Sequence, residues 1–247
     1  MTLKKYLYIA MLLTTGLVCG QDYKSRIYNS YLNSQMGIWK EVMEEMESAY
    51  TQCPDMDLLY DLLEAEYGYT GYCISMNERK EARRVHNKAL DHLHLLLEHK
   101  LDNPRVYCLQ GAFYGFGVFL EPTKAVKNKR RSVEANRRAL KLGPQEPQAW
   151  MEAANIKYFT PAIFGGSKKG AVPLYEKAVR LYESSAGRTH QNWVYLNCLA
   201  GLGTAYEKTG QIHKAGEVYR KLLKLEPSFS WIKDDRYPQF LQKHSMN

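Results

Sequence analysis

The sequence predicts an all-α protein built from helical hairpins that stack in series. Helical periodicity runs from Tyr23 to about Leu225. No alternating run of Val, Ile, Thr or Tyr bounded by turn residues, the pattern that strands require, interrupts it. The amphipathic segments come in pairs separated by short breaks, which is typical of a helical repeat array. With 45% hydrophobic and 24% charged residues in a chain of 247, the composition is that of a folded protein.

The first twenty residues have the features of a bacterial signal peptide. Lys4 and Lys5 form a positive start, residues 6–18 are apolar, and small Gly20 precedes the mature chain. Thirteen apolar residues reach only about 20 Å as a helix, short of the roughly 30 Å hydrocarbon core of a bilayer. We therefore expect cleavage and export to the periplasm. The alternatives are secretion and a lipid anchor on Cys19.

The clearest repeat lies near the C-terminus, in residues 196–229. Its small and aromatic residues are Leu199, Leu202, Gly203, Tyr206, Gly210, Ala215, Tyr219, Leu222 and Pro227. This spacing resembles the tetratricopeptide repeat family of exported bacterial type in every position except Leu222, where the family prefers Ala. Gly203 and Ala215 are expected where the two helices cross, because small residues allow close approach. Gly210 is expected to end the first helix.

The resemblance implies a right-handed α-α superhelix of about five helical hairpins with long helices. The predicted single domain spans residues 21–247, with repeats at 23–55, 56–103, 104–146, 147–189 and 196–229 and a C-terminal cap at 230–247. Successive second-helix anchors are 39 to 50 residues apart, whereas the family period is 34. A HEAT-like or Sel1-like solenoid of longer period is therefore the alternative. The extra residues are expected to lengthen helices or loops, notably at residues 119–128 and 160–167.

One of these loops, residues 161–171, has the sequence PAIFGGSKKGA. Ser167 is expected to cap the following helix, and the two glycines to form a tight turn. An anion site at this helix start is the alternative, although no phosphate-loop motif is present.

No metal site or cofactor is predicted. Four cysteines follow the signal peptide, at Cys53, Cys73, Cys108 and Cys198, without a CxxC pair or zinc-like spacing. Their even number and an oxidising compartment allow a disulfide, whereas buried thiols in helix contacts are the other interpretation. His92 and His99 are seven residues apart rather than the three or four of a helical metal site.

The sequence shows no catalytic set. It contains no GxSxG, HExxH or dinucleotide motif, and Glu64 and Glu66 point to different faces of one helix. The resemblance implies instead a non-catalytic scaffold or adaptor of the bacterial cell envelope, whose first helices line a concave groove for a protein or peptide. Carried over by spacing, this predicted groove contains Arg105, Cys108, Phe116, Gln148, Met151, Asn155, Phe159, Asn197, Thr204, Glu207 and Lys208. The alternative is a protein that binds a small molecule or glycan in an enclosed pocket of the superhelix.

The charge distribution gives a second candidate surface. The formal net charge is +8, and loss of Lys4 and Lys5 lowers it to +6. Residues 124–141 contain eight basic side chains against the single acid Glu134. This segment is expected to be a solvated helix face, or else to dock an acidic partner or an anionic membrane surface. As a hypothesis, partner choice is set by Arg130, Arg131, Arg137 and Arg138. Export makes nucleic acid an unexpected partner.

Overall fold

The computed structural model describes residues 22–99 and 102–245. Within these ranges all regular structure is helical, which confirms the predicted all-α class. The predicted signal peptide at residues 1–20 lies outside the described residues. None of the described helices is both long and apolar enough to cross a membrane.

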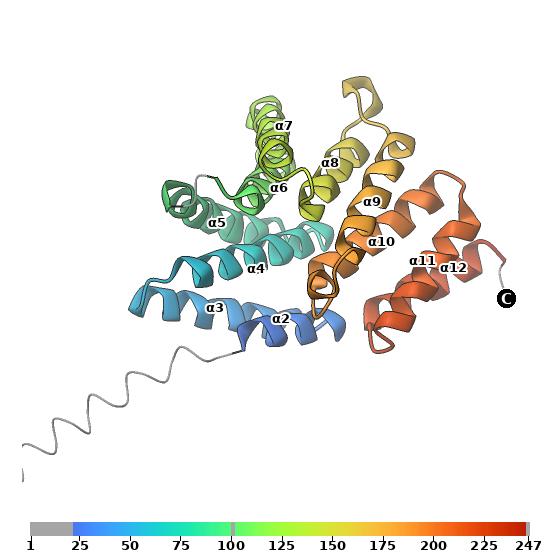
Figure 1. The fold of residues 1–247 in the computed structure, drawn as a ribbon, viewed down its shortest axis with the longest axis horizontal. Helices are drawn as coiled ribbons and strands as arrows, with labels where there is room; N and C mark the ends of the chain where they lie inside the picture. The colour runs from blue at the N-terminus through green and yellow to red at the C-terminus, as the bar shows by residue number, and fades with distance from the viewer. Residues whose placement is uncertain (1–21, 100–101, 246–247) are drawn as a thin grey trace, which may run out of the picture.

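Within the described residues, five helical hairpins follow one another (Figure 1). The pairs are α2 (Tyr23–Leu32) with α3 (Met36–Gln52), α4 (Met56–Ser75) with α5 (Arg79–His99), α6 (Pro104–Leu120) with α7 (Ala125–Leu142), α8 (Pro147–Phe159) with α9 (Lys168–Glu183), and α10 (Trp193–Lys208) with α11 (Ile212–Leu225). Within each pair the helices pack on each other, and each hairpin packs on the next. This serial stacking is the predicted solenoid.

Local sequence explains where several helices begin. The side chains of Asp55, Asn103 and Asn192 each accept a hydrogen bond from a backbone amide in the first turn of α4, α6 and α10. Ser167 caps α9 in the same way by accepting from the amide of Gly170 at 2.9 Å, as expected. Before it, Gly165 adopts a left-handed conformation with φ of 85°.

Small residues allow the last two helices of the array to cross closely, as the sequence predicts. A Cβ atom added to Gly203 on α10 would lie 2.8 Å from the ring of Tyr219 on α11, and Ala215 is fully buried. Gly210 has φ of 79° at the end of α10, where a left-handed residue terminates the helix.

The two ends of the array meet, which the sequence did not predict. The Tyr28 hydroxyl on α2 donates to the Glu226 carboxylate, at the C-terminal end of α11, at 2.5 Å. The Ser230 hydroxyl donates to the carbonyl of Leu32 at 2.9 Å. The ring of Tyr31 also contacts that of Trp193 on α10, with centroids 5.7 Å apart. Figure 1 shows α2 beside the lower ends of α10 and α11.

The C-terminal segment covers the last hairpin. It consists of η5 (Trp231–Arg236) and α12 (Tyr237–Lys243). Phe240 is fully buried and packs edge-on against Tyr219, with centroids 5.2 Å apart. Glu207 on α10 accepts a hydrogen bond from Lys243 at 2.8 Å and another from Arg236. These contacts close the apolar end of the array.

Candidate functional site

Aromatic rings from α3, α4, α6 and α10 pack together in the interior of the array. Trp39 and Trp193 pack edge to face with centroids 5.1 Å apart, and Tyr67 stacks on Phe116 at 5.6 Å. Tyr67 also contacts Trp193 at 5.9 Å, so the rings form one continuous cluster. This part of the interior is therefore a packed core.

A buried carboxyl group lies beside these rings. Glu152 on α8 is 4% exposed and accepts hydrogen bonds from the Tyr67 hydroxyl at 2.8 Å and from the Asn155 amide at 3.2 Å. Burial raises the pKa of Glu152 to about 7, although both hydrogen bonds act in the opposite direction. The group is buried, and two neighbours already donate to it, so we assign it to the core.

A partly exposed cluster of polar and aromatic side chains joins α2, α4 and α6. We call it the Arg105 cluster, and its members are Lys24, Tyr60, Asp61, Glu64 and Arg105. The guanidinium of Arg105 lies 4.5 Å from the centroid of the Tyr60 ring and 3.5 Å from a carboxylate oxygen of Glu64. The Tyr60 hydroxyl donates to Glu64 at 3.0 Å, and Lys24 pairs with Asp61 at 3.1 Å.

The electrostatics of the Arg105 cluster are those of a partly buried site rather than of an open surface. Burial raises the pKa of both Asp61 and Glu64, yet their side chains remain 23% and 21% exposed. Desolvation opposes the charge on Arg105, but the neighbouring Tyr60 and Glu64 raise its pKa overall. Arg105 therefore stays cationic, and its side chain is 49% exposed.

Four of the predicted groove residues are buried, so the prediction that they offer contact surface was wrong. Gln148 and Met151 are 2% and 1% exposed because helices on both sides cover α8, and Cys108 is fully buried. Glu207 is 6% exposed because the C-terminal segment covers it. Spacing alone placed these four residues in the groove, but in the structure they make packing contacts between helices.

The other predicted groove residues keep some exposure but do not form one surface. Phe116 is half-buried against Tyr67, and Asn155 bonds to Glu152. Arg105 lies at the start of its helix, whereas Phe159 and Lys208 end theirs and are exposed. The remaining two, Asn197 and Thr204, are half-buried on α10. Among these exposed residues of the predicted groove, Arg105 is the one that contacts both an aromatic ring and a carboxylate.

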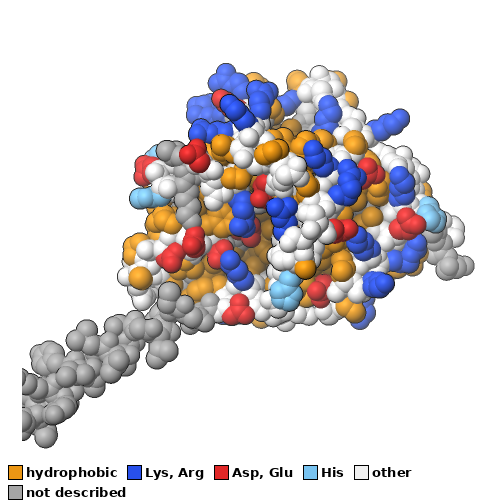
Figure 2. Space-filling model, in the orientation of Figure 1, with side chains coloured by type: hydrophobic (Ala, Val, Ile, Leu, Met, Phe, Trp, Pro, Cys, Tyr) orange, Lys and Arg blue, Asp and Glu red, His pale blue; other side chains and the backbone are white. Residues whose placement is uncertain are grey.

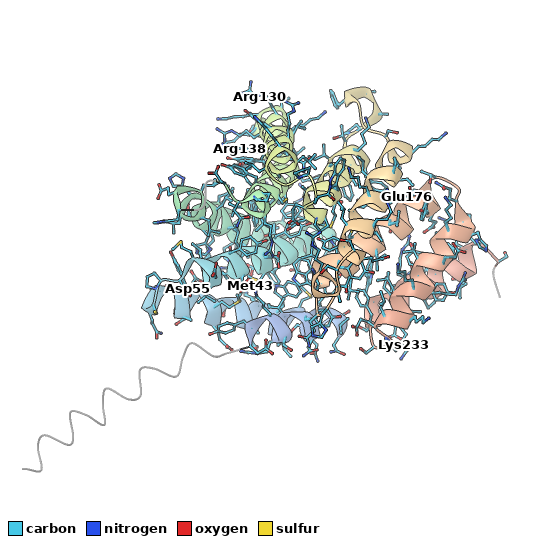
Figure 3. The ribbon with its side chains drawn as sticks, in the orientation of Figure 1. Met43, Asp55, Arg130, Arg138, Glu176 and Lys233 are labelled. Carbon is cyan, nitrogen blue, oxygen red and sulfur yellow. The ribbon has the colours of Figure 1, made fainter. Side chains whose placement is uncertain are left out.

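The predicted basic patch lies on α7. Arg130, Arg131, Arg137 and Arg138 all keep some exposure, and within the described ranges no carboxylate forms an ion pair with them. Two of them lie over tyrosines of α6: Arg131 is 5.4 Å from the Tyr114 ring and Arg138 is 4.3 Å from the Tyr107 ring. Figure 2 shows Lys and Arg side chains gathered over this helix, on which Figure 3 labels Arg130 and Arg138.

Most of the cysteine and histidine side chains considered above as disulfide partners or metal ligands are buried in helix contacts. The four cysteines within the described residues are free; Cys53 is exposed, and Cys73, Cys108 and Cys198 are buried. His92 lies 3.0 Å from a carboxylate oxygen of the buried Glu66, and the hydrogen bond with Glu66 raises the pKa of His92 against the lowering effect of desolvation. In the part of the chain that the structure describes, no three His, Cys, Asp or Glu side chains form a group that could hold a metal ion.

The serial stacking of helical hairpins defines an all-helical repeat protein. Residues 196–229 match the family model of the tetratricopeptide repeat. This segment is thus a tetratricopeptide repeat by sequence, and it accounts for one of the hairpins of the array. The matched range covers most of α10 and all of α11. This is the hairpin whose residue spacing most resembles the family pattern.

Solved structures share the fold of the whole array. The thermophilic tetratricopeptide repeat protein TTC0263 from Thermus thermophilus matches with a TM-score of 0.60 and 16% identity, over 85% of this chain and 93% of that chain. The HusA haemophore from Porphyromonas gingivalis matches with a TM-score of 0.60 and 19% identity, over 78% of this chain and 97% of that chain. The search of curated proteins gave no match. At these identities the likeness concerns the fold.

Proposed function

We propose that this protein is a non-catalytic scaffold that binds a protein partner of the bacterial cell envelope through the Arg105 cluster. The observation that carries the proposal is the position of Arg105: its half-exposed guanidinium lies over the Tyr60 ring and beside Glu64. Arg and Tyr are enriched among the residues that dominate binding energy at protein interfaces. Their packing holds the guanidinium in place before binding, which lowers the entropy lost on association.

The chemistry of the cluster favours a partner with a carboxylate or a backbone carbonyl. Arg105 presents several N–H donors in a planar group, and only one carboxylate in the cluster, Glu64, lies within ion-pair distance of it. The four arginines of α7 add long-range attraction for the same kind of partner, because exposed positive charge raises the association rate with acidic proteins.

The proposal is tested by affinity purification from the native envelope with the mature chain as bait. Arg105→Glu is expected to lose a partner that the wild-type chain retains, since the new carboxylate faces Glu64 and repels an acidic group. Lys233→Glu makes the same change of charge at an exposed side chain of η5 (Figure 3), outside the cluster, and is expected to retain the partner. Partner recovery that is equal with wild type and Arg105→Glu would refute the proposal.

Charge reversal of the four arginines distinguishes an effect on the association rate from an effect on the dissociation rate. Replacing Arg130, Arg131, Arg137 and Arg138 with Glu is expected to lower the association rate most at low salt, whereas Arg105→Glu is expected to raise the dissociation rate. Unchanged binding at low salt after the reversal would remove α7 from the proposal.

A second candidate function is binding of a small ligand. A cavity of about 400 Å³ lies between α5 and the α6–α7 connection, and its lining includes Arg83, His86, Glu121 and Lys124. That HusA, a protein of the same fold, is called a haemophore supports testing haem together with polar metabolites. Two results together would favour this function over the scaffold. One of these compounds would stabilise the wild-type protein against thermal unfolding but not the Arg83→Ala variant, and affinity purification would recover no protein partner.

A further inference from the structure

Large hydrophobic side chains are exposed around two connections within hairpins. Val126 and Ile163 are 88% and 85% exposed, and the phenylalanines Phe119, Phe159 and Phe164 are 52%, 61% and 65% exposed. They flank or lie in the α6–α7 and α8–α9 connections. We call these five residues the apolar tip. Monomeric soluble proteins rarely leave such side chains grouped in water, so the group indicates a contact surface.

A direct contact joins the two connections. The Lys129 ammonium on α7 donates to the carbonyl of Phe164 at 2.9 Å and lies 5.3 Å from the centroid of the Phe164 ring. Val126 precedes Lys129 by three residues and therefore lies on the same face of α7. Phe164 of one connection and Val126 of the other thus lie on one surface, on either side of Lys129. Figure 1 shows the α8–α9 connection projecting at the top of the array, next to α7.

The turn that carries Ile163 and Phe164 has a fixed shape. Gly165 has a left-handed φ, and a Cβ atom on Gly166 would lie 1.7 Å from the Thr160 carbonyl oxygen, so only glycine fits there. The Lys157 ammonium donates to the carbonyl of Gly165 at 2.9 Å. The backbone therefore holds the two hydrophobic side chains outward.

Basic side chains surround the apolar tip. Lys127 and Arg130 lie on the first turns of α7, and Lys168 and Lys169 on the first turn of α9. Glu121, the acid that directly follows α6, is already paired with Lys124 at 2.7 Å. Figure 2 shows this combination of positive and hydrophobic side chains along the upper edge of the molecule.

We propose that the apolar tip docks reversibly on the surface of an anionic lipid bilayer. Ile163, Phe164 and Val126 enter the headgroup region, and the surrounding Lys and Arg side chains meet lipid phosphates while their stems lie along the apolar surface. The shape favours a bilayer over an acidic protein, because the hydrophobic side chains project from two turns and form no groove for a partner helix. The basic rim on both sides is complementary to a uniformly negative plane.

Sedimentation of the mature chain with lipid vesicles tests this proposal. We expect stronger binding to phosphatidylcholine vesicles that contain phosphatidylglycerol than to phosphatidylcholine alone, and weakening by salt. The double variant Ile163→Asp/Phe164→Asp is expected to lower the partition coefficient at least about tenfold. The matched control is Leu142→Asp, at the opposite end of the same basic helix, where Leu142 is 38% exposed; its binding should equal that of the wild type.

Two further measurements make the outcome decisive. In the Ile163→Trp variant, brominated lipids should quench the fluorescence of the added tryptophan, because the side chain is inserted into the bilayer rather than adsorbed on it. Thermal unfolding checks that each variant folds. Equal binding by the Ile163→Asp/Phe164→Asp variant, equal loss in Leu142→Asp or no preference for phosphatidylglycerol would overturn the proposal. Loss of an acidic protein partner in the double variant, without vesicle binding by the wild type, would reassign the tip to protein docking. Arg105→Glu should leave vesicle binding unchanged, so the test is independent of the proposed scaffold function.

Discussion

Tyr28 and Glu226 lie 198 residues apart in the sequence and share a hydrogen bond of 2.5 Å. The bond connects the first helix of the array to the end of the last hairpin. A solenoid normally contacts only its sequence neighbours and leaves its ends apart. Here the contact between the ends adds a long-range term to the stability of the fold.

Tyr28→Phe should therefore destabilise the whole array. The variant leaves Glu226 without its donor while preserving the buried ring, and we expect the free energy of unfolding to fall by about 1.5–3 kcal/mol, as for a hydrogen bond to a charged group. Urea denaturation followed by circular dichroism measures the change. Tyr50→Phe, at a partly buried tyrosine of α3, is the control and should be within about 0.5 kcal/mol of wild type. An unchanged midpoint in Tyr28→Phe would show that the end contact contributes nothing.

Gly203→Ala should loosen the hairpin that carries the family match. The added Cβ would approach the buried Tyr219 ring to 2.8 Å, and overpacking of this kind costs about 1–3 kcal/mol. Gly37→Ala, in α3, is the opposite case because no atom lies within 4 Å of the added Cβ. That variant is expected to gain up to about 1 kcal/mol from helix propensity. Thermal unfolding should rank them in this order; a stabilised Gly203→Ala would contradict the close crossing of α10 and α11.

Glu152 should make the fold less stable as the pH rises. Its folded pKa of about 7 lies above its ordinary value of 4.5, so the folded state binds the proton more tightly than the unfolded state does. The stabilisation is complete below about pH 4.5 and is lost as pH rises towards about 7 and beyond. At 1.36 kcal/mol per pKa unit the loss is on the order of 3 kcal/mol.

The measurement is denaturant unfolding of the wild type and of Glu152→Gln at pH 5 and pH 8. The amide is neutral at both values, so the variant should lack this part of the pH dependence and gain relative stability at pH 8. Identical pH dependence of the two proteins would show that Glu152 does not titrate in this range.

Only one of the four cysteines among the described residues should react readily in the folded protein. Burial raises the pKa of Cys73 to about 11 and that of Cys108 well above its usual range, which disfavours the reactive thiolate. Cys53 is exposed. Iodoacetamide labelling followed by peptide mass spectrometry should modify Cys53 first, and the other three only after unfolding. Early labelling of Cys108 or Cys198 would indicate that the core opens locally.

Local patterns in the sequence predicted the hairpins well. Gly203, Gly210 and Ala215 act within about a dozen residues of one another, through close helix packing and the left-handed helix end. The cap by Ser167 and the turn at Gly165 are equally local. Such features depend on backbone geometry and small side chains, so spacing alone reveals them.

The candidate site was predicted only in part. Arg105 was chosen from spacing, but its neighbours Tyr60 and Lys24 come from other helices and no motif connects them. Met151 and Gln148 had the spacing of groove residues, yet neighbouring helices bury them. One signal in the sequence could have indicated the cluster. Tyr60 and Glu64 are four residues apart and therefore share a helix face, and the basic residue Arg105 begins the next hairpin.

The sequence by itself determined the helices, their pairing and the family resemblance, because capping, periodicity and close crossing are set by residues near one another. Only the tertiary structure decided that α2 meets the end of α11, which first-helix positions remain exposed and that two separate connections share one apolar surface. Those outcomes depend on how small rotations between hairpins accumulate along the array, and no short segment encodes that sum.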